Sequence, residues 1–305
     1  MTDSTVAWVF PGQGAQEPGM GRDIYDAFPS ARALYERADA ILGRPISRLC
    51  FEGPEEELGK TFNSQPAIFL TSLALLTVAR EQGALPDAPA FAAGHSLGEY
   101  TALTAAGAMA FEDGLRLVET RGRLTQAAAE ATPGGMAAVL GLDEAATQAV
   151  CDEAGVELCN INSPGQLVIG GLKGKIAKAC ELALARGAKR AIALDVGGAF
   201  HTSLMQPAVA EFSAALAAVD IKPPSVPVVA NDSARPITEP DAIRTELAYQ
   251  LTHPVRWVQC VEYMAGQGVG TFVEIGPGRV LTGLIKRIAA GAQTKNINGA
   301  GSLAS

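Results

Sequence analysis

Short apolar segments alternate with alanine-rich helical patterns along most of the chain, and this alternation restricts the possible folds more than any other feature. The segments TVAWVF, PAFAAG and GTFVEI have the composition of strands, and helical patterns cover residues 31–42, 67–82 and 280–290. Strands that alternate with helices pair in parallel, because each crossover helix returns the chain to the same edge of the sheet. The sequence therefore predicts an α/β fold built on a parallel sheet.

The middle of the chain has a different rhythm, with two strand patterns in direct succession. The segment GGMAAVLGL is followed by a helical pattern, then by VELCNI and QLVIGG, and then by a second helical pattern and KRAIALDV. This βαββαβ order is that of a ferredoxin-like unit. We therefore predict a ferredoxin-like domain at residues 130–198, inserted into a large domain formed by residues 1–129 and 199–305.

The composition supports a large buried core and argues against two classes of partner. Of the 305 residues, 48% are hydrophobic and 18% are charged, which excludes global disorder and leaves the tail NINGAGSLAS as a predicted disordered segment. The formal net charge of −8 argues against a general nucleic-acid binder. The apolar run at residues 67–79 is shorter than a membrane span, and the N-terminal segment lacks the pattern of a secretory signal. We expect neither nucleic acid nor a membrane among the partners.

The cysteines and histidines argue against a disulfide framework and against a metal centre. The cysteines are five in number, widely separated and never in a CxxC pair: Cys50, Cys151, Cys159, Cys180 and Cys260. Such a pattern is typical of buried thiols in a reducing cytoplasm, where we expect the protein to be located. With three histidines in the whole chain, a metal site built mainly on imidazoles is disfavoured.

The segment FAAGHSLGEYTAL contains the strongest single candidate for a reactive side chain. Gly94-x-Ser96-x-Gly98 lies between a strand pattern and a helical pattern, which is the arrangement of a nucleophile elbow. The glycines permit a sharp turn that exposes the serine hydroxyl at a helix N-terminus, where free N–H groups can stabilise an oxyanion. The alternative is a serine that only caps the helix, which is a common structural role.

A serine nucleophile needs a base, and three histidines are available for that role. His95 is adjacent to Ser96, so its side chain should point away from the hydroxyl, and His253 lies in a polar loop before a proline. His201 follows the glycine-rich segment VGGAF, where the predicted insert returns to the large domain, and this position favours it as the base. The group that orients its ring is either Asp195 or a backbone carbonyl, which can also hold an imidazole tautomer.

The loop after the first strand, PGQGAQEPG, invites a dinucleotide-binding interpretation that fails. Gly12 and Gly14 have the required spacing, but Glu17 occupies the place of the third glycine. Two interpretations remain, an ordinary glycine-rich turn and a cleft-lining loop that brings Gln13 close to the reacting centre.

Arg121 is the one charged residue on an otherwise apolar helical face. Leu117, Leu124 and Ala128 share that face at spacings of three and four residues. A planar guanidinium in such a place suits bidentate capture of a ligand carboxylate, but a structural salt bridge is the more common outcome.

Seven motifs in one order then identify a family: PGQGAQ, GHSLGEYTAL, ETRGRL, NSPGQLVIGG, GAFHTSLM, QLTHPVRW and EIGPGRVLTGL. In these motifs and their spacing the chain resembles malonyl-CoA:acyl carrier protein transacylases over nearly its whole length. The resemblance implies an α/β-hydrolase-like large domain with a ferredoxin-like insert. It also implies ping-pong transfer of a malonyl group from malonyl-CoA to the phosphopantetheine thiol of acyl carrier protein, by a dyad of Ser96 and His201 without a cofactor or metal.

The resemblance assigns roles to several residues around that dyad. It implies that the backbone N–H groups of Gln13 and Leu97 form the oxyanion hole. It implies that the carbonyl of Gln250 orients His201, so that no acid is required.

The same resemblance implies how substrate is held. Arg121 matches the arginine that binds the malonyl carboxylate, and Phe200 in the segment GAFH narrows the pocket against α-branched acyl units. Asn162, together with Lys189 and Arg190, is expected to meet the coenzyme A arm or its phosphates.

Acyl carrier proteins are acidic, as this chain is, so we expect a local basic patch beside the cleft. The candidates are Lys189, Arg190, Lys286 and Arg287. We expect the chain to act as a monomer in fatty acid or polyketide synthesis. Three alternatives stay open: an acyltransferase for another acyl unit, a serine hydrolase that releases its acyl group to water, and a carrier-binding module without activity.

Overall fold

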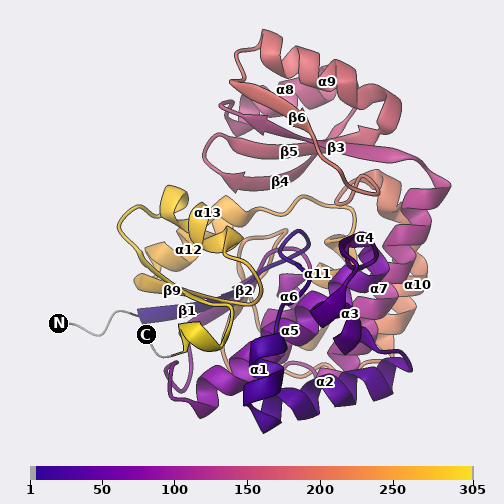
Figure 1. Ribbon diagram of the computed structural model, residues 1–305. Helices are drawn as coiled ribbons and strands as arrows, with labels where there is room; N and C mark the ends of the chain where they lie inside the picture. The colour runs from indigo at the N-terminus through magenta and orange to yellow at the C-terminus, as the bar shows by residue number, and fades with distance from the viewer. Residues whose placement is uncertain (1–4, 304–305) are drawn as a thin grey trace.

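Two β-sheets organise the chain, a six-stranded sheet in a larger part and a four-stranded sheet in a smaller part that lies above it in Figure 1. The computed structural model of the protein describes residues 5–303. The fold class predicted from the sequence, a parallel-sheet α/β body with a small antiparallel unit, is confirmed.

Helices surround the large sheet. They are α1 (Arg22–Ala27), α2 (Pro29–Leu42), α3 (Ile46–Glu52), α4 (Glu55–Gly59), α5 (Thr61–Glu81), α6 (Gly98–Ala105), α7 (Phe111–Ala131), α10 (Gln206–Ala217), α11 (Pro240–Tyr249), α12 (Trp257–Gly266) and α13 (Val280–Ile288), with 3₁₀ turns at Ser203–Met205 and Ala300–Ser302. The strands are β1 (Thr5–Phe10), β2 (Phe91–Gly94), β7 (Val228–Val229), β8 (Pro236–Ile237), β9 (Val269–Ile275) and β10 (Gln293–Ile297).

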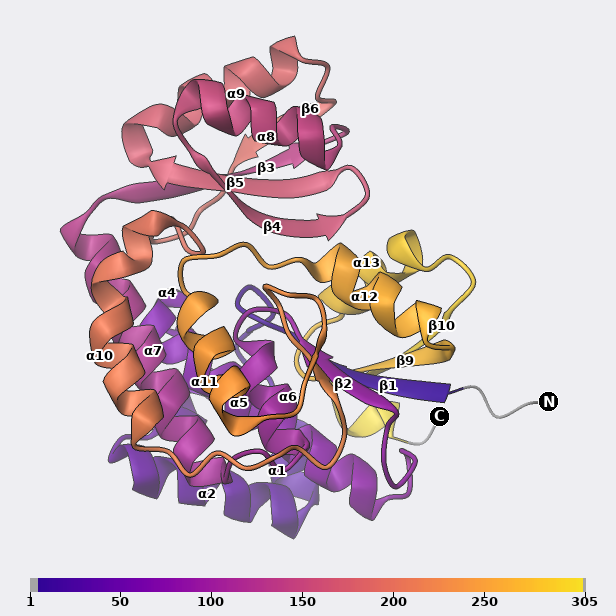
Figure 2. The ribbon, with the colours of Figure 1, turned by 180° about the vertical axis from the view of Figure 1, so that it is seen from behind.

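The large sheet is a parallel sheet buried on both faces. Its order is β10-β9-β1-β2-β7-β8, and every pair is parallel except β7 with β8. On the central strand, Trp8 and Phe10 pack into the core that contains α2, α5 and α7, whereas Ala7 and Val9 pack with α12 and α13 on the opposite face. Figures 1 and 2 show these two sets of helices on either side of the strands. Burial on both faces explains why the strands read as continuous apolar runs.

Helix α5 is the central helix of this core. By length and composition it could cross a membrane, but 89% of its most apolar window is buried inside the protein. It begins at Thr61, six residues before the helical pattern expected from the sequence. The polar residues of its first turns are buried, so an apolar pattern does not reveal them. The apolar composition of α5 is therefore that of a buried core helix.

The smaller part has the predicted βαββαβ order. It consists of β3 (Gly134–Leu140), α8 (Glu144–Ala154), β4 (Glu157–Ser163), β5 (Gln166–Leu172), α9 (Lys173–Ala185) and β6 (Arg190–Ala193). The sheet order is β4-β5-β3-β6, with all neighbours antiparallel. These elements lie within the predicted insert, whose limits at residues 130 and 198 stay a prediction.

Two sets of contacts fix the smaller part against the larger one. Backbone hydrogen bonds join Val255 to Cys159 and to Ile161, so β4 is bonded to the loop that precedes α12. The Glu157 carboxylate accepts hydrogen bonds from the Ser203 N–H, at 3.0 Å, and from its hydroxyl, at 2.6 Å. Ser203 lies two residues after His201. The position of that histidine therefore depends on how the insert packs against the larger part.

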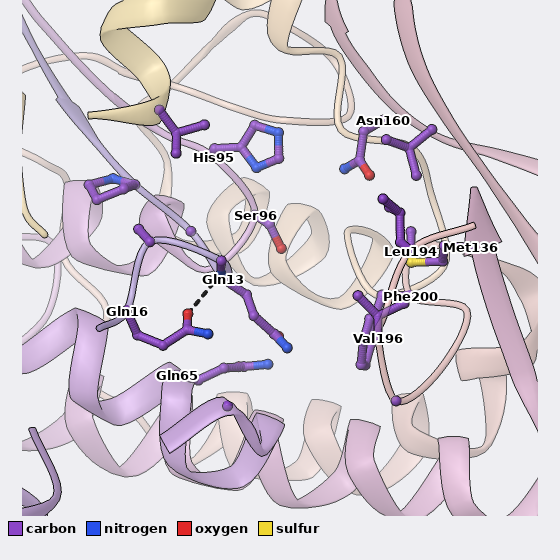
Figure 3. A pocket seen from close by; sticks show the side chains of 18 of the residues that line it. Gln13, Gln16, Gln65, His95, Ser96, Met136, Asn160, Leu194, Val196 and Phe200 are labelled. Carbon is purple, nitrogen blue, oxygen red and sulfur yellow. Dashed lines mark hydrogen bonds between the residues drawn. The ribbon is translucent and has the colours of Figure 1, made fainter. Parts of the chain in front are cut away.

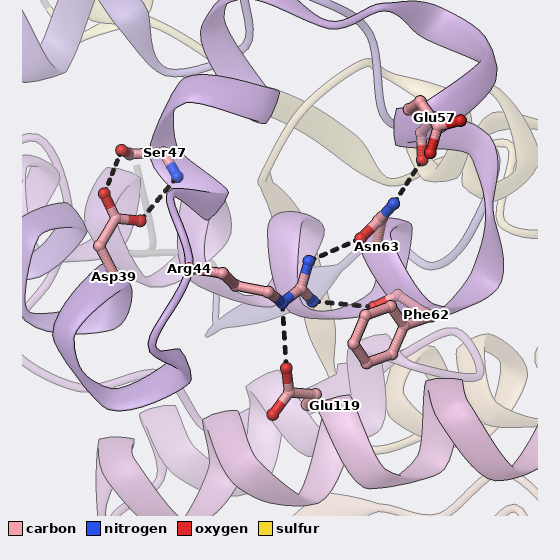
Figure 4. Close-up of polar contacts among 7 residues, drawn as sticks. All are labelled: Asp39, Arg44, Ser47, Glu57, Phe62, Asn63 and Glu119. Carbon is pink, nitrogen blue, oxygen red and sulfur yellow. Dashed lines mark hydrogen bonds and ion pairs between the residues drawn. The ribbon is translucent and has the colours of Figure 1, made fainter.

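Arg44 joins the two long helices that border the cleft (Figure 4). Its guanidinium donates to Glu119 of α7 at 3.1 Å, to Asn63 of α5 at 2.6 Å and to the Phe62 carbonyl at 3.3 Å. The same group lies over the Phe62 ring. Because these partners are two or three residues from Arg121 and from Gln65, the contacts fix the helices from which both side chains reach the cleft.

The C-terminal tail differs from the expectation of disorder. Residues 293–297 form β10, which pairs in parallel with β9, and a 3₁₀ turn follows. The Asp23 carboxylate accepts a hydrogen bond from the Ala300 N–H at 2.6 Å. Pairing with a distant strand orders this polar segment, and such pairing is not visible in local composition. Residues 304 and 305 of the predicted tail lie outside the described residues.

The junction of β2 and α6 requires its two glycines. A Cβ atom on Gly98 would lie 2.1 Å from the carbonyl oxygen of Phe10, and one on Gly94 would lie 1.8 Å from the backbone of Gly98. Both distances are far below a van der Waals contact, and in both cases the obstacle is backbone rather than a side chain that could turn aside. The strand and helix can approach this closely only when both positions are glycine.

We expect Gly98→Ala to lower the free energy of unfolding by roughly 1–3 kcal/mol, because the added methyl group overpacks against backbone. The matched control is Gly283→Ala in α13, where a Cβ atom meets no atom within 4 Å. The control should raise stability by up to about 1 kcal/mol, through helix propensity. Urea denaturation of both variants tests this, and equal effects at the two positions would contradict it.

Candidate active site

A cleft of about 960 Å³ lies between the two sheets and contains most of the predicted site residues. Residues 11–16 line it together with Ser96, His95 and His201 from the larger part. The smaller part and the chain leaving it contribute a wall that includes Met136, Asn160 and Phe200. In Figure 3 the Ser96 hydroxyl points into the space between these two sides.

Ser96 has the strained geometry of a nucleophile elbow. Its φ is 51°, in the left-handed region that residues other than glycine rarely adopt. The amide of Asn231, a fully buried residue, holds the turn on both sides: it accepts from the Ser96 N–H at 2.7 Å and donates to the Gly94 carbonyl at 2.7 Å. Strain of this kind persists only where surrounding contacts over-determine the backbone, and Asn231 supplies two of them.

His201 lies within hydrogen-bonding distance of the serine. Its Nε2 is 2.8 Å from Ser96 Oγ, and its Nδ1 is 2.7 Å from the Gln250 carbonyl oxygen. A carbonyl can only accept, so Nδ1 carries the proton and Nε2 is left as the acceptor for the serine proton. Of the two orienting groups considered from the sequence, it is a carbonyl, not the Asp195 carboxylate, that contacts the ring.

Burial keeps His201 neutral. Desolvation, followed by the positive charge of Arg121, lowers the pKa of His201 to about 3. An imidazole with so low a pKa is uncharged at neutral pH and can therefore accept a proton from the hydroxyl.

The other two histidines point elsewhere. His95 Nε2 is 2.8 Å from Asn162 Oδ1, and its ring makes an edge contact with Trp257. His253 Nδ1 is 2.9 Å from the Tyr249 carbonyl oxygen. Asn162 thus lines the cleft and holds His95 in place at the same time.

Arg121 is a buried cation beside the nucleophile, with 4% of its surface exposed. Its Nη1 donates to Gln65 Oε1 at 2.9 Å, and its Nη2 donates to Gln250 Oε1 at 2.9 Å and to Ser96 Oγ at 3.1 Å. These acceptors are neutral, and across residues 5–303 no carboxylate forms a salt bridge with this guanidinium. Arg121 therefore does not form the structural salt bridge that was one of the two alternatives from the sequence.

Two backbone N–H groups beside the nucleophile have no acceptor among the described residues. No hydrogen bond within the described part of the chain occupies the N–H of Gln13 or that of Leu97, the residue at the start of α6. Gln13 belongs to the loop after β1, which lies directly against the elbow: a Cβ atom on Gly12 would be 2.4 Å from the His95 carbonyl oxygen. This close approach places the Gln13 loop beside the turn that contains Ser96 and Leu97.

An apolar wall faces these polar groups (Figure 3). Phe200 lies in it with Met136, Leu194 and Val196. Gly198, two residues before Phe200, packs against α7, because a Cβ atom there would lie 2.4 Å from Ala129 Cβ. Close packing therefore explains the small residue at this position.

The basic residues named from the sequence fall into two groups. Lys286 and Arg287 are exposed on α13, whose residues Val280, Leu281 and Leu284 line the cleft. Lys189 and Arg190 are exposed at the start of β6 and are not among the cleft-lining residues of the described chain.

Three buried polar residues of the site were not named from the sequence. They are Gln65, Glu99 and Asn231. Asn231 lies two residues after the end of the apolar strand β7, and polar residues at the carboxyl ends of parallel strands commonly face the ligand crevice. That signal could have found Asn231, whereas the contacts of Gln65 and Glu99 join residues of distant segments and leave no local pattern.

A serine at an elbow, a neutral histidine at 2.8 Å and two free N–H groups define a site for acyl transfer. The sequence model of the acyl transferase domain family matches residues 7–303, and the chain belongs to this family of acyltransferases.

The relatives of the chain indicate which acyltransferases it is most like. They confirm the resemblance to malonyl-CoA:acyl carrier protein transacylases that the sequence motifs indicated. The chain is 47% identical over 290 residues to the malonyl CoA-acyl carrier protein transacylase of Bacillus subtilis (strain 168), covering 93% of this chain and 90% of that protein. Its structure is similar to an acyl carrier protein S-malonyltransferase from Vibrio cholerae, with a TM-score of 0.94, 40% identity and 99% of both chains covered. A further similar structure is a malonyl-transacylase in complex with a type II PKS acyl-carrier protein, with a TM-score of 0.94 and 42% identity over 99% of this chain and 98% of that one.

We expect the His201 ring to remain neutral between pH 8 and pH 5 in the folded protein, since its pKa is lowered to about 3. Nitrogen-15 NMR of the imidazoles, assigned by the loss of one set of signals in His201→Gln, measures this directly. In the urea-unfolded chain the same ring should titrate near pH 6.5. A midpoint near 6.5 in the folded protein would contradict the buried, neutral base.

The lowered pKa of His201 also makes the free energy of unfolding depend on pH. Between pH 6.5 and about 3 the unfolded chain binds this proton and the folded protein does not, so the stability contributed by the group falls as the pH falls. The His201→Gln variant should therefore lose less unfolding free energy than the wild type over that range. Equal losses in the two proteins would show that other groups govern acid unfolding.

Proposed function

We propose that this chain transfers a malonyl group from malonyl-CoA to the phosphopantetheine thiol of an acyl carrier protein, through a malonyl ester on Ser96. The observation that carries the proposal is the buried Arg121 guanidinium, 3.1 Å from Ser96 Oγ and bonded to neutral acceptors. A desolvated cation without a counter-ion is costly in the free protein, and a substrate carboxylate would relieve that cost. The names of the relatives support malonyl as the acyl group.

In the first half-reaction Ser96 Oγ attacks the thioester carbonyl while His201 Nε2 takes the hydroxyl proton. The resulting oxyanion would accept hydrogen bonds from the Gln13 and Leu97 N–H groups. The C–S bond then breaks, and His201 gives its proton to the departing coenzyme A thiol. The Gln250 carbonyl holds Nδ1–H throughout and stabilises the imidazolium that forms.

The second half-reaction runs in the opposite direction with a different thiol. The carrier's phosphopantetheine thiol gives its proton to His201, and its sulfur attacks the ester carbonyl of malonyl-Ser96. When the C–O bond breaks, Ser96 Oγ recovers the proton from His201. Each bond and proton is accounted for by protein side chains and the two thiols, so the proposal requires no metal and no cofactor.

Shape and charge around the dyad support selectivity for malonyl. The carboxylate of a malonyl ester would lie toward Arg121, whose planar fork suits bidentate binding. Phe200 lies on the facing apolar wall, where it would restrict substituents on the α-carbon. Asn162 borders the same cleft and is our candidate for a contact with the coenzyme A arm.

We further propose that the chain acts as a monomer in fatty acid or polyketide synthesis, in the cytoplasm. Side chains of a single copy supply the nucleophile, the base and the cation, which supports a monomeric enzyme. The cytoplasmic location stays a prediction from the cysteine pattern.

We expect Arg121→Ala to lower kcat/KM for malonyl-CoA by about 100-fold or more, the loss expected from a desolvated charge pair worth about 3 kcal/mol. Transfer from acetyl-CoA, which lacks the carboxylate, should fall far less. Arg123→Ala is the matched control, since this arginine is exposed on the same helix and pairs with Glu211. Equal losses with both donors would favour a different acyl unit.

Docking of the acidic carrier should depend on Lys286 and Arg287, which are exposed on α13, a helix with cleft-lining residues. We expect their joint replacement by glutamate to raise KM for the carrier about tenfold at low salt, and less at high salt, because screening weakens exposed charges. The control is the same charge reversal at Lys189 and Arg190, which lie away from the cleft lining. Unchanged carrier kinetics in the first variant would exclude this patch.

A further inference from the structure

The side-chain amide of Gln250 forms three hydrogen bonds whose directions are fixed. Its Oε1 accepts from Arg121 Nη2 at 2.9 Å, and its Nε2 donates to the Ser96 carbonyl at 2.9 Å and to Glu99 Oε2 at 2.6 Å. A guanidinium can only donate and a backbone carbonyl can only accept, so the amide cannot be reversed. One side chain therefore links the cation, the backbone of the nucleophile and a carboxyl group.

The carboxyl group at the end of this chain of contacts is fully buried. Glu99 lies in the first turn of α6, three residues after the nucleophile, and none of its surface is exposed. Its Oε2 bonds to Gln250, and its Oε1 has no hydrogen-bond partner within the described residues. No lysine or arginine forms a salt bridge with it in that part of the chain, and Arg121 is reached only through Gln250.

Charged and titratable groups on four helices interact with Glu99. They are Glu246 of α11, Arg121 of α7, Cys260 of α12 and Tyr100 of its own helix. Burial, and next the charge of Glu246, raises the pKa of Glu99 well above its usual range. A carboxylate here would also cancel the field of Arg121 at the cleft, whereas a carboxylic acid leaves that field intact.

We propose that Glu99 is a positioning residue, which acts as an uncharged carboxylic acid and, through the Gln250 amide, aims the Arg121 fork at Ser96 without neutralising it. The relay would give Arg121 a defined orientation while it keeps its charge for the substrate carboxylate. This inference rests on the proposed function, since it concerns how a malonyl carboxylate is recognised.

The test compares Glu99→Ala with Glu99→Gln. Steady-state transfer from malonyl-CoA and from acetyl-CoA gives, for each variant, the ratio of the two kcat/KM values between pH 6 and pH 9. Glu99→Ala should lower the malonyl-to-acetyl ratio about tenfold or more, mainly through KM for malonyl-CoA, because the Gln250 amide that holds the Arg121 fork loses one of its three hydrogen bonds. Glu99→Gln should keep the ratio within about threefold of the wild type at every pH, since an amide preserves both the shape and the lack of charge.

Gln250→Glu is a second test variant. Unlike Glu99→Ala, it nearly conserves the size of the side chain and therefore leaves no cavity. A carboxylate at this position would still accept from Arg121 but would neutralise it, so the malonyl preference should be lost while transfer from acetyl-CoA falls less. Glu211→Ala, which removes an exposed glutamate of α10, is the control and should leave the ratio unchanged.

The outcomes separate this inference from the proposed function. If Glu99→Ala keeps the wild-type ratio, or if Glu99→Gln loses it as fully as Glu99→Ala, the uncharged positioning role is wrong. Arg121→Ala is measured in parallel: if it does not change the ratio, the proposed function itself fails. If Arg121→Ala lowers the ratio and Glu99→Ala does not, the inference alone is overturned.

Discussion

The hydrogen bond between Ser96 Oγ and His201 Nε2 joins residues 105 positions apart, and the architecture of the protein is arranged around it. The serine is placed by the sharp turn from β2 into α6, which Gly94 and Gly98 permit. The histidine is placed where the chain leaves the small sheet and re-enters the large part, with its own backbone in the left-handed region. Contacts between the two parts, such as that of Glu157 with Ser203, therefore bear directly on the distance between nucleophile and base.

Around this pair the protein buries one positive charge and compensates it with neutral dipoles. Gln65, Gln250 and the serine hydroxyl all direct oxygen atoms at Arg121. The same charge helps to lower the pKa of His201, so a single cation contributes both to recognition of an anionic acyl group and to the neutral state of the base. Burial of a charge in this way costs stability, and Arg44 joins α7, which carries Arg121, to α5, which carries Gln65.

Local sequence patterns are sufficient to predict the alternation of strands and helices, the elbow, and the βαββαβ succession of elements in the smaller part, since each depends on residues close together in the chain. Arg121 was visible as a charged residue on an apolar helical face, but its partners were not, because Gln65 and Gln250 are 56 and 129 positions away. Contacts between distant segments also explain why Gln65 and Glu99 leave no local signal in the sequence. The prediction of a disordered tail is wrong for the same reason, since β10 is ordered by its pairing with β9.

The most direct test of the account is the intact mass of the protein after brief mixing with malonyl-CoA, followed by addition of phosphopantetheinylated carrier protein. A malonyl adduct should form on the wild type and not on Ser96→Ala, and the adduct should then transfer to the carrier. An adduct that water removes while the carrier stays unlabelled would contradict it and would identify a hydrolase. An adduct formed from another acyl-CoA but not from malonyl-CoA would preserve the dyad and overturn the malonyl assignment.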